Sequence, residues 1–238
     1  MLINQNIAFK QKTVAAIIIG DEILTGKVKD ENVFILSKFL FEQGLCLHKV
    51  EIIPDIIDEI AAVVYRLSNN FDYVFTSGGI GPTHDDKTYE SVAKAFGLHL
   101  EYNKNLCNIN GNKEEQKIFT FPKSCKIIYT NAFRIPLVVV KNVYIFPGVP
   151  KLFSGLLYAV KDHFIGRTKK RVLIYTKKTE SKIATILAKI QSEYPDVAIG
   201  SYPKYNHNDY RVMISLECFS VDLIKKVSNK VKIAIDGF

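Results

Sequence analysis

Residues that could bind a charged ligand are concentrated in residues 73–88. There an apolar run is followed by glycines and then by acids. The glycines are Gly78, Gly79 and Gly81, and the acids are the neighbours Asp85 and Asp86. Glycine lets backbone N–H groups come close to an anion, and the start of a following helix adds a partial positive charge. Two carboxylates would repel a bare phosphate, so they indicate a divalent cation between the acids and the phosphate oxygens.

Two interpretations of this stretch stay open. In the first, it binds a phosphate group together with a divalent metal ion. In the second, it is a glycine turn before a helix whose solvated start favours Asp in any case. Asp86 lies nearer the expected helix start than Asp85, so it is the stronger metal-ligand candidate and also the candidate N-cap. Thr88 is either a hydroxyl contact to a phosphate or an ordinary helix-start residue.

A second acidic loop, residues 20–26, lies near the start of the chain and is flanked by glycines. Its acids are Asp21 and Glu22, and either is suited to act as a second metal ligand or to orient the loop. The loop follows residues 13–19, whose β-branched apolar composition is typical of a central strand with both faces buried.

Strands and helices are expected to alternate between residues 13 and 97. The expected strands 13–19, 47–53 and 72–76 are each followed by a helix with apolar residues on one face. This alternation predicts an α/β fold with a parallel or mostly parallel sheet and helices on both faces. Ligands of such sheets gather outside the carboxyl ends of the strands. Both acidic loops follow such ends, so we expect them to face one crevice.

Antiparallel structure is expected after the alternating region. Residues 126–130 are an expected strand, and residues 137–140 and 143–146 are an expected hairpin joined by two residues. A rigid turn with two prolines follows at residues 147–150 and precedes a helix. The polar residues 103–120 have a weak pattern that predicts a helix plus a loop.

A basic stretch, residues 167–171, marks the expected boundary between a domain over residues 13–166 and a small α+β domain over residues 167–238. Most of the net charge of +8 lies from Arg167 to the end of the sequence, where 14 Lys and Arg face 7 Asp and Glu. The preceding residues are nearly neutral, with 18 cations against 17 anions. A basic excess of this size is more often a solvated face than a binding groove, and no aromatic ladder accompanies it, so we do not expect nucleic acid as a partner.

The composition predicts a soluble cytoplasmic protein. Apolar residues make up 47% of the 238 positions, which is ample for a core. No apolar run is long enough to span a bilayer, and no cleavable signal is evident, so we expect no membrane partner. The four cysteines are scattered, which argues against a zinc ribbon or a disulfide framework.

Three separated motifs, in this order, resemble those of a known family. They are Gly20-Asp-Glu-Ile-Leu-Thr-Gly26 with Asp30 and Asn32, Ser77-Gly-Gly-Ile-Gly-Pro-Thr-His-Asp-Asp-Lys-Thr88, and Pro147-Gly-Val-Pro150. They are similar to the molybdopterin-binding, MoaB/Mog-type domain in the form found at the amino terminus of CinA proteins and of eukaryotic FAD synthases. The resemblance covers residues 14–163, and Gly200-Ser-Tyr-Pro203 extends it towards the end of the chain.

The resemblance implies a three-layer α/β fold, a homo-oligomer, and a phosphate-containing ligand that is either a pterin or a dinucleotide. In Mog-type proteins the site binds molybdopterin, and an acidic pair handles magnesium during adenylylation. The CinA and FAD-synthase branches are associated with cleavage of ADP-ribose or FAD that depends on a divalent metal such as Mg, Mn or Co. By motif match, the ligand-binding residues are Gly20, Asp21, Glu22, Ser77, Gly78, Gly79, Gly81, Thr88, Pro147 and Gly148. The metal-binding candidates are Asp86, Asp85 and Asp21, of which Asp86 and Asp85 are also the catalytic candidates.

We therefore expect a metal-dependent hydrolase of a nucleotide pyrophosphate. The alternatives are a molybdopterin-binding or adenylylating protein of molybdenum cofactor biosynthesis, and a non-catalytic binding module of the same fold. Residues 132–137 keep the last alternative open, because bulky residues and Arg134 replace the Gly-x-x-Pro-Gly-like segment that is common in the family. The sequence lacks the amidohydrolase domain of full-length CinA, so deamidation of nicotinamide mononucleotide is not expected.

Overall fold

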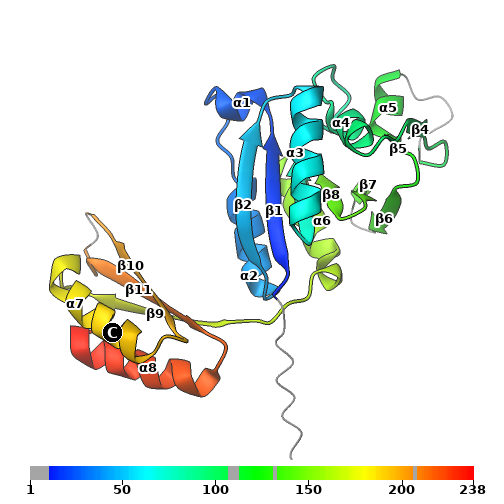
Figure 1. Cartoon of the computed structure of the whole chain (residues 1–238). Coiled ribbons are helices and arrows are strands. Elements are labelled where there is room, and N and C mark those ends of the chain that lie inside the picture. Colours follow the sequence, from blue (N-terminus) through cyan, green and yellow to red (C-terminus); the bar gives the residue numbers. More distant parts are fainter. Residues whose placement is uncertain (1–10, 107–112, 131–132, 206–207) are drawn as a thin grey trace, which may run out of the picture. The chain divides into compact units, whose positions relative to one another are not determined.

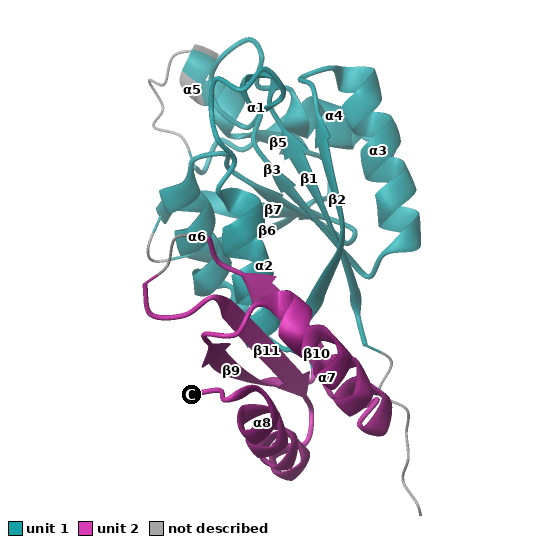
Figure 2. Cartoon of the chain, turned by 90° about the vertical axis from the view of Figure 1, so that its left-hand side faces the viewer, with its two compact units in different colours: residues 1–166 teal, residues 167–238 magenta. Residues whose placement is uncertain are grey.

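A computed structural model describes residues 11–106, 113–130, 133–205 and 208–238 (Figure 1). Its internal contacts divide the chain into two compact units, residues 1–166 and residues 167–238 (Figure 2). The division falls at the basic stretch that marks the expected domain boundary. In the parts of the chain that are described, no helix combines the length and the apolar character needed to cross a membrane.

The first unit is built on a six-stranded sheet with the order β2-β1-β3-β8-β7-β6. Four of its strands are mutually parallel: β1 (Thr13–Ile19), β2 (Cys46–Ile53), β3 (Tyr73–Ser77) and β8 (Val143–Phe146). Two further strands are antiparallel to their neighbours: β7 (Phe133–Val140) and β6 (Lys126–Thr130). The mostly parallel sheet is confirmed, and so is the central position of residues 13–19, because β1 pairs with both β2 and β3.

Helices cover both faces of this sheet, as the alternation of strands and helices predicts. The helices of the first unit are α1 (Asp21–Leu24), α2 (Asn32–Glu42), α3 (Ile57–Asn70), α4 (Thr88–Ala95), α5 (Lys113–Ile118) and α6 (Pro150–Ala159). Alternate residues of β1 belong to two separate cores. Ala15 and Ile17 pack with α3 and α4, whereas Val14 and Ala16 pack with α2 and α6. The two faces of one buried strand therefore define three layers.

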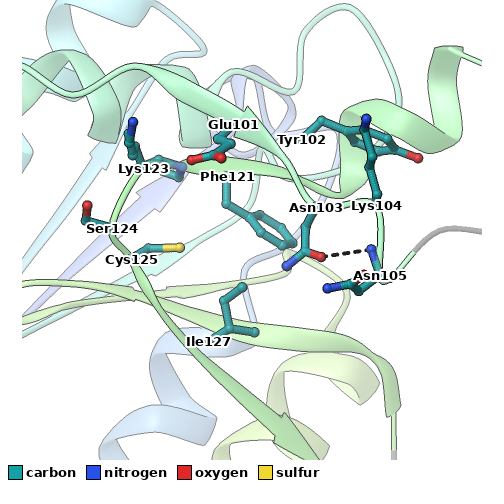
Figure 3. Close-up of a pocket in the computed structure, with 11 residues that line it drawn as sticks. Glu101, Tyr102, Asn103, Lys104, Asn105, Phe121, Lys123, Ser124, Cys125 and Ile127 are labelled. Carbon is teal, nitrogen blue, oxygen red and sulfur yellow. Dashed lines mark hydrogen bonds between the residues drawn. The ribbon is translucent and has the colours of Figure 1, made fainter.

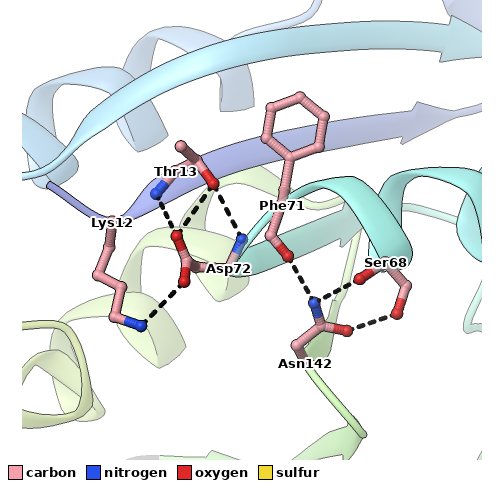
Figure 4. Close-up of polar contacts among 6 residues, drawn as sticks. All are labelled: Lys12, Thr13, Ser68, Phe71, Asp72 and Asn142. Atoms are coloured by element: carbon pink, nitrogen blue, oxygen red, sulfur yellow. Dashed lines mark hydrogen bonds and ion pairs between the residues drawn. The ribbon is translucent and has the colours of Figure 1, made fainter. Parts of the chain in front are cut away.

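Polar contacts fix the amino ends of the parallel strands, opposite the edge where both acidic loops begin (Figure 4). Asp72 accepts hydrogen bonds from the Thr13 backbone N–H at 2.8 Å and from Thr13 Oγ1 at 3.0 Å, and it pairs with Lys12 at 2.9 Å. These contacts lower the pKa of the Asp72 carboxyl to about 2, chiefly through the hydrogen bond from Lys12. Asn142 Nδ2 donates to the carbonyl oxygens of Ser68 at 2.9 Å and of Phe71 at 2.8 Å.

Asn142 also lies in the two-residue turn that joins β7 to β8, which confirms the predicted hairpin. A small two-stranded sheet beside α4 was not predicted. It pairs β4 (Leu100–Tyr102) with β5 (Thr120–Pro122), and its three-residue strands are too short to leave a clear pattern in the sequence. Part of the predicted helix and loop at residues 103–120 lies outside the described residues, and α5 occupies the remainder.

The second unit is an antiparallel three-stranded sheet with two helices, in the strand order β10-β11-β9. Its elements are β9 (Lys170–Thr176), α7 (Glu180–Glu193), β10 (Ala198–Pro203), β11 (Val212–Cys218) and α8 (Val221–Ile235). Its own core joins Ile174 and Ile214 of the sheet to Ile183 of α7 and Val227 of α8. The separate core means that each unit can be described by itself.

Candidate functional site

Three loops meet at the carboxyl ends of β1, β3 and β8. Gly78, at the end of β3, has a φ of +106°, and a Cβ atom on it would lie 2.2 Å from the carbonyl oxygen of Ile19. Its backbone N–H donates to the carbonyl oxygen of Phe146 at 3.2 Å. A Cβ atom on Gly148 would lie 3.2 Å from Gly78 Cα. The loops that carry the three motifs are therefore interlocked through their main chains, which requires glycine at Gly78.

Asn32, the first residue of α2, ties two of these loops together. It is 4% exposed, and its Nδ2 donates to Ser77 Oγ at 2.8 Å and to the carbonyl oxygen of Gly148 at 2.7 Å. Asp30 fixes the start of α2 by accepting from the backbone N–H groups of Asn32 at 3.2 Å and of Val33 at 3.1 Å. Asn32 Oδ1 is buried and has no hydrogen-bond partner among the described residues. The sequence identified Asn32 as part of a motif but assigned it no role.

Thr88 braces the glycine loop from within. It is completely buried, its Oγ1 donates to the carbonyl oxygen of Gly78 at 2.8 Å, and its backbone N–H donates to that of Gly79 at 2.9 Å. A Cβ atom on Gly79 would lie 2.4 Å from Thr88 Oγ1. The hydroxyl proton of Thr88 is therefore already donated within the loop. Thr88 is also the first residue of α4, which agrees with the helix-start interpretation. The phosphate contact stays a prediction that would need this bond to break.

Asp86 closes the turn that follows the glycines. Its Oδ2 accepts from the Thr83 backbone N–H at 2.8 Å and also from the Thr83 hydroxyl. The N-cap of α4 is Lys87, so the structure does not use Asp86 as the cap. The Asp85 side chain is 61% exposed, and its Oδ1 lies 3.9 Å from Nδ1 of His84, whose side chain is 99% exposed. The two acids therefore have different surroundings although they are neighbours in sequence.

Two lysines lie in the same region, Lys117 from another element and Lys87 from the motif itself. The ammonium of Lys117, on α5, contacts the carbonyl oxygen of Thr83, so a cation lies beside the glycine turn. Lys87 Nζ donates to the carbonyl oxygen of Asp55 at 3.0 Å and so links the turn to the end of β2. These contacts bring positive charge to a place where the motifs supply mainly acids.

Asp55 is the acid of this site that sequence reasoning missed. It follows β2, and its Oδ2 accepts from the Asp21 backbone N–H at 3.0 Å. Burial raises the pKa of the Asp55 carboxyl, and the negative charges of Asp21, Glu22 and Asp85 raise it further. The place of Asp55 directly after an expected strand was the signal that could have identified it, because the other acidic loops occupy the same place.

The acids fit a hard divalent cation only in part. Within residues 11–106, 113–130, 133–205 and 208–238, no three His, Cys, Asp or Glu side chains are arranged to hold a metal ion by themselves. Magnesium is usually held by one or two carboxylates, with water and substrate phosphates completing the shell. Burial is the main cause of the raised pKa of Asp55, and the negative charges of Asp21, Glu22 and Asp85, which a cation would neutralise, add to it. The metal-ligand roles of Asp21, Asp85 and Asp86 therefore stay predictions, and Asp55 joins them as a further acid of this site.

The segment that departs from the family pattern is packed against α6. Residues 131 and 132 lie outside the described residues, and Phe133 and Arg134 belong to β7. The Phe133 ring fills the space beside Gly155, where a Cβ atom would lie 2.1 Å from it. Arg134 is exposed. At Pro147–Pro150 the predicted turn is present, with Pro147 buried and Pro150 opening α6.

A separate cavity of about 430 Å³ opens beside the small sheet (Figure 3). Side chains from β4, β5 and β6 line it, among them Glu101, Phe121 and Ile127. None of the residues of the three glycine loops belongs to this cavity. Its border ends close to residues 107–112, which lie outside the described part of the chain, so we assign it no ligand.

Comparison with known proteins gives two family matches. A model described as probable molybdopterin binding domain matches residues 15–165, and one described as FAD synthase, middle domain, matches residues 171–237. A probable FAD synthase of Caenorhabditis elegans is 29% identical over 96% of this chain, but the chain spans only 51% of that relative. A protein of Archaeoglobus fulgidus is 31% identical, with 87% of this chain and 91% of the relative covered.

Among solved structures, the chain is similar to the protein CinA, of unknown function, from Thermoplasma acidophilum. The TM-score is 0.60 at 29% identity, and the match covers 65% of this chain and 99% of that chain. This match and the strand order together confirm the predicted MoaB/Mog-like fold with helices on both faces of its sheet.

Proposed function

Since the chain belongs to the molybdopterin-binding domain family through residues 15–165, we propose that it hydrolyses a nucleotide pyrophosphate of the ADP-ribose or FAD type. The match to the FAD synthase middle domain follows at residues 171–237. The observation that carries the proposal is the meeting of acids from three loops beside a glycine cradle. Asp21, Asp55 and Asp85 come from different loops, and the charges of Asp21 and Asp85 add to the effect of burial that raises the pKa of Asp55. A site that gathers this much negative charge is suited to a cation and a phosphate chain.

Hydrolysis of a pyrophosphate adds a water oxygen to one phosphorus and breaks that phosphorus's bond to the bridging oxygen, which leaves as part of the second phosphate. The backbone N–H groups of the Gly78–Gly81 loop would bind phosphate oxygens, and Lys117 would add a positive charge beside them. Asp21, Asp85 and Asp86 would hold a Mg, Mn or Co ion, which would neutralise the phosphate oxygens when bound. Asp55 is suited to take the proton of the attacking water, because its raised pKa makes it a stronger base than an ordinary aspartate.

The relatives favour a dinucleotide as substrate. The curated relatives named probable FAD synthase align along 96% of this chain, across both units. FAD is a dinucleotide whose two halves are joined by a pyrophosphate. A site that binds FAD therefore holds the group that a pyrophosphatase cleaves. We infer the same class of substrate for this chain.

Release of AMP tests the proposal directly. The purified chain is incubated with ADP-ribose or FAD and with Mg, Mn or Co, and AMP is measured by chromatography. We expect AMP with at least one metal and its loss in Asp86→Ala. The matched control is Asp162→Ala, which removes an exposed acid from the short 3-10 helix Lys161–His163, outside all three loops. The absence of AMP with every metal at high enzyme concentration would overturn the proposal.

A second candidate is a protein that binds or adenylylates molybdopterin, and the description of the family model over residues 15–165 favours it. A pterin that copurifies with the chain, recognised by its fluorescence after oxidation, would support this function over the first. The non-catalytic module is excluded if AMP release is present in the wild type and absent in Asp86→Ala. Assembly into a homo-oligomer stays a prediction, which sedimentation analysis can test.

A further inference from the structure

The second unit carries a basic notch at the start of α7 that the proposed function does not use. Two cavities of about 390 Å³ and about 560 Å³ adjoin there and share Thr179 and Arg211. The cations that line them are Lys177, Lys178, Lys182, Lys204 and Arg211. They come from the turn after β9, the first turn of α7 and the connection between β10 and β11. The positive charge therefore converges from three elements on one place.

The two acids at the notch are already engaged. Glu180 Oε1 accepts from Ser201 Oγ at 2.7 Å, and Asp236 pairs with Lys178 at 2.7 Å. Lys177, Lys182 and Arg211 have no ion-pair partner among the residues that the structure describes, and the same is true of Lys204. These four residues are called the α7 basic notch below. Because the Ser201 hydroxyl is neutral, Glu180 keeps its negative charge, but the four cations exceed this one acid by three charges, a surplus that a bound anion would offset.

Backbone contacts hold the notch in place. The Arg211 N–H donates to the carbonyl oxygen of Thr176 at 2.9 Å, and the Lys204 N–H donates to that of Arg211 at 2.8 Å. Thr176 is completely buried, and its Oγ1 donates to the carbonyl oxygen of Ile235 at 2.8 Å. Two of the cations are thus attached to main chain that is fixed to the core. A site whose backbone is fixed before binding loses less entropy when a ligand arrives.

We propose that the α7 basic notch binds a phosphate monoester, and that its ligand is a mononucleotide. The planar fork of Arg211 and the ammonium groups of Lys177 and Lys182 suit the oxygens of a dianionic phosphate. Tyr205 lines the larger cavity and is 89% exposed, so its ring is available to stack on a base. The cations form a compact cluster and not a stripe along one face, which favours a small ligand over a nucleic acid strand. None of these residues belongs to the glycine loops.

Nuclear magnetic resonance of the full chain tests the proposal residue by residue. Inorganic phosphate, AMP and a single-stranded oligonucleotide are titrated separately, and the backbone amide signals of Thr179, Ser181 and Arg211 are followed. We expect saturable shifts with phosphate and with AMP, and tighter binding of AMP. Because the signals report on the second unit alone, they also persist in Asp86→Ala, so failure of this proposal is distinguishable from failure of the proposed hydrolase.

Variants separate the charge from the ring. Lys182→Gln with Arg211→Gln is expected to weaken both ligands by at least about tenfold, because each removes a charge-assisted hydrogen bond. The matched control, Lys189→Gln with Lys225→Gln, removes the same charge from exposed helix positions outside both cavities and leaves the affinity unchanged. Tyr205→Ala weakens AMP and leaves phosphate unaffected.

Three results would overturn the proposal. The first is the absence of saturable shifts at these amides up to about 10 mM phosphate or AMP, a range that includes even weak binding. The second is equal weakening by the notch variant and the control variant, which would show unspecific attraction to a basic surface. The third is an oligonucleotide that binds far more tightly than AMP and loses affinity in both the notch variant and the control variant. This result would assign the basic surface to nucleic acid.

Discussion

Asn32→Ala removes the carboxamide that joins the glycine loop to the Pro147–Pro150 turn. Two hydrogen bonds are lost, each with a net contribution of about 1 kcal/mol, and the buried Ser77 hydroxyl is left unpaired at a cost of about 1–3 kcal/mol. Removal of the unpartnered Oδ1 returns about 1 kcal/mol. The first unit should therefore lose about 2–4 kcal/mol of its free energy of unfolding.

Hydrogen exchange followed by peptide-resolved mass spectrometry measures this loss in β1 and β3 without averaging it with the second unit. The matched control is Asn142→Ala, which removes hydrogen bonds to the Ser68 and Phe71 carbonyl oxygens, and one accepted from the Ser68 hydroxyl, at the opposite edge of the same sheet (Figure 4). Both variants should be destabilised to a similar degree. Asn32→Ala alone should also weaken ADP-ribose binding and AMP release, because it alone frees two ligand loops from each other.

A particular pattern of results would refute this reasoning. If Asn32→Ala and Asn142→Ala reduce AMP release equally, the effect follows from stability and not from the loops. If Asn32→Ala changes the exchange of β3 by less than about 0.5 kcal/mol, which is the size of an ordinary surface substitution, the carboxamide does not hold the loops together.

Three further predictions concern single residues. Gly78→Ala should cost roughly 3 kcal/mol or more, because φ is +106° and the new Cβ would meet Ile19, whereas Gly97→Ala has φ +65° and open space and should cost only about 1–2 kcal/mol; urea denaturation compares the two. Asp55→Asn should raise the free energy of unfolding at neutral pH yet weaken Mn²⁺ binding in calorimetry. The wild type should lose stability as the pH rises above 3.8 through the raised pKa of Asp55, and the variant should not show this loss. Asp72, whose pKa is lowered to about 2, stabilises the fold above pH 3.8 and loses that effect as the pH falls towards 2; Asp72→Asn should cost about 1–2 kcal/mol at pH 7, after allowance for solvent screening, and little at pH 2.

The fold was largely predictable because its signals are local. Residues 14–19 form one continuous apolar run that is rich in β-branched side chains, and only a strand covered on both faces can bury such a run completely. The two-residue connection at Lys141 and Asn142 leaves room for nothing but a hairpin. By contrast, β4 and β5 have three residues each and pair across a segment with little pattern, so their sheet could not be found without coordinates.

The site was predictable in its loops and less so in its side chains. Glycines and acids at strand ends identified the edge of the sheet, because topology alone brings those ends together. The role of each side chain depends on contacts that are distant in sequence. Asn32 meets Gly148 across 116 positions, and Asp55 meets Asp21 across 34. Thr88 and Asp86 also turn inwards to bond with their own loop, which no spacing rule reveals.

The cradle at the strand ends is made almost entirely of main chain, and this has a consequence for how new specificities can arise. Its shape is set by glycines packed against neighbouring carbonyl groups and by one buried carboxamide, none of which needs to touch the variable part of a ligand. The side chains that reach the rim, such as Lys117 and Asp85, are exposed or lie on separate elements. They can be exchanged without disturbing the cradle. If the proposed function holds, a library confined to such rim positions would be a practical starting point for changing which phosphate ester binds there.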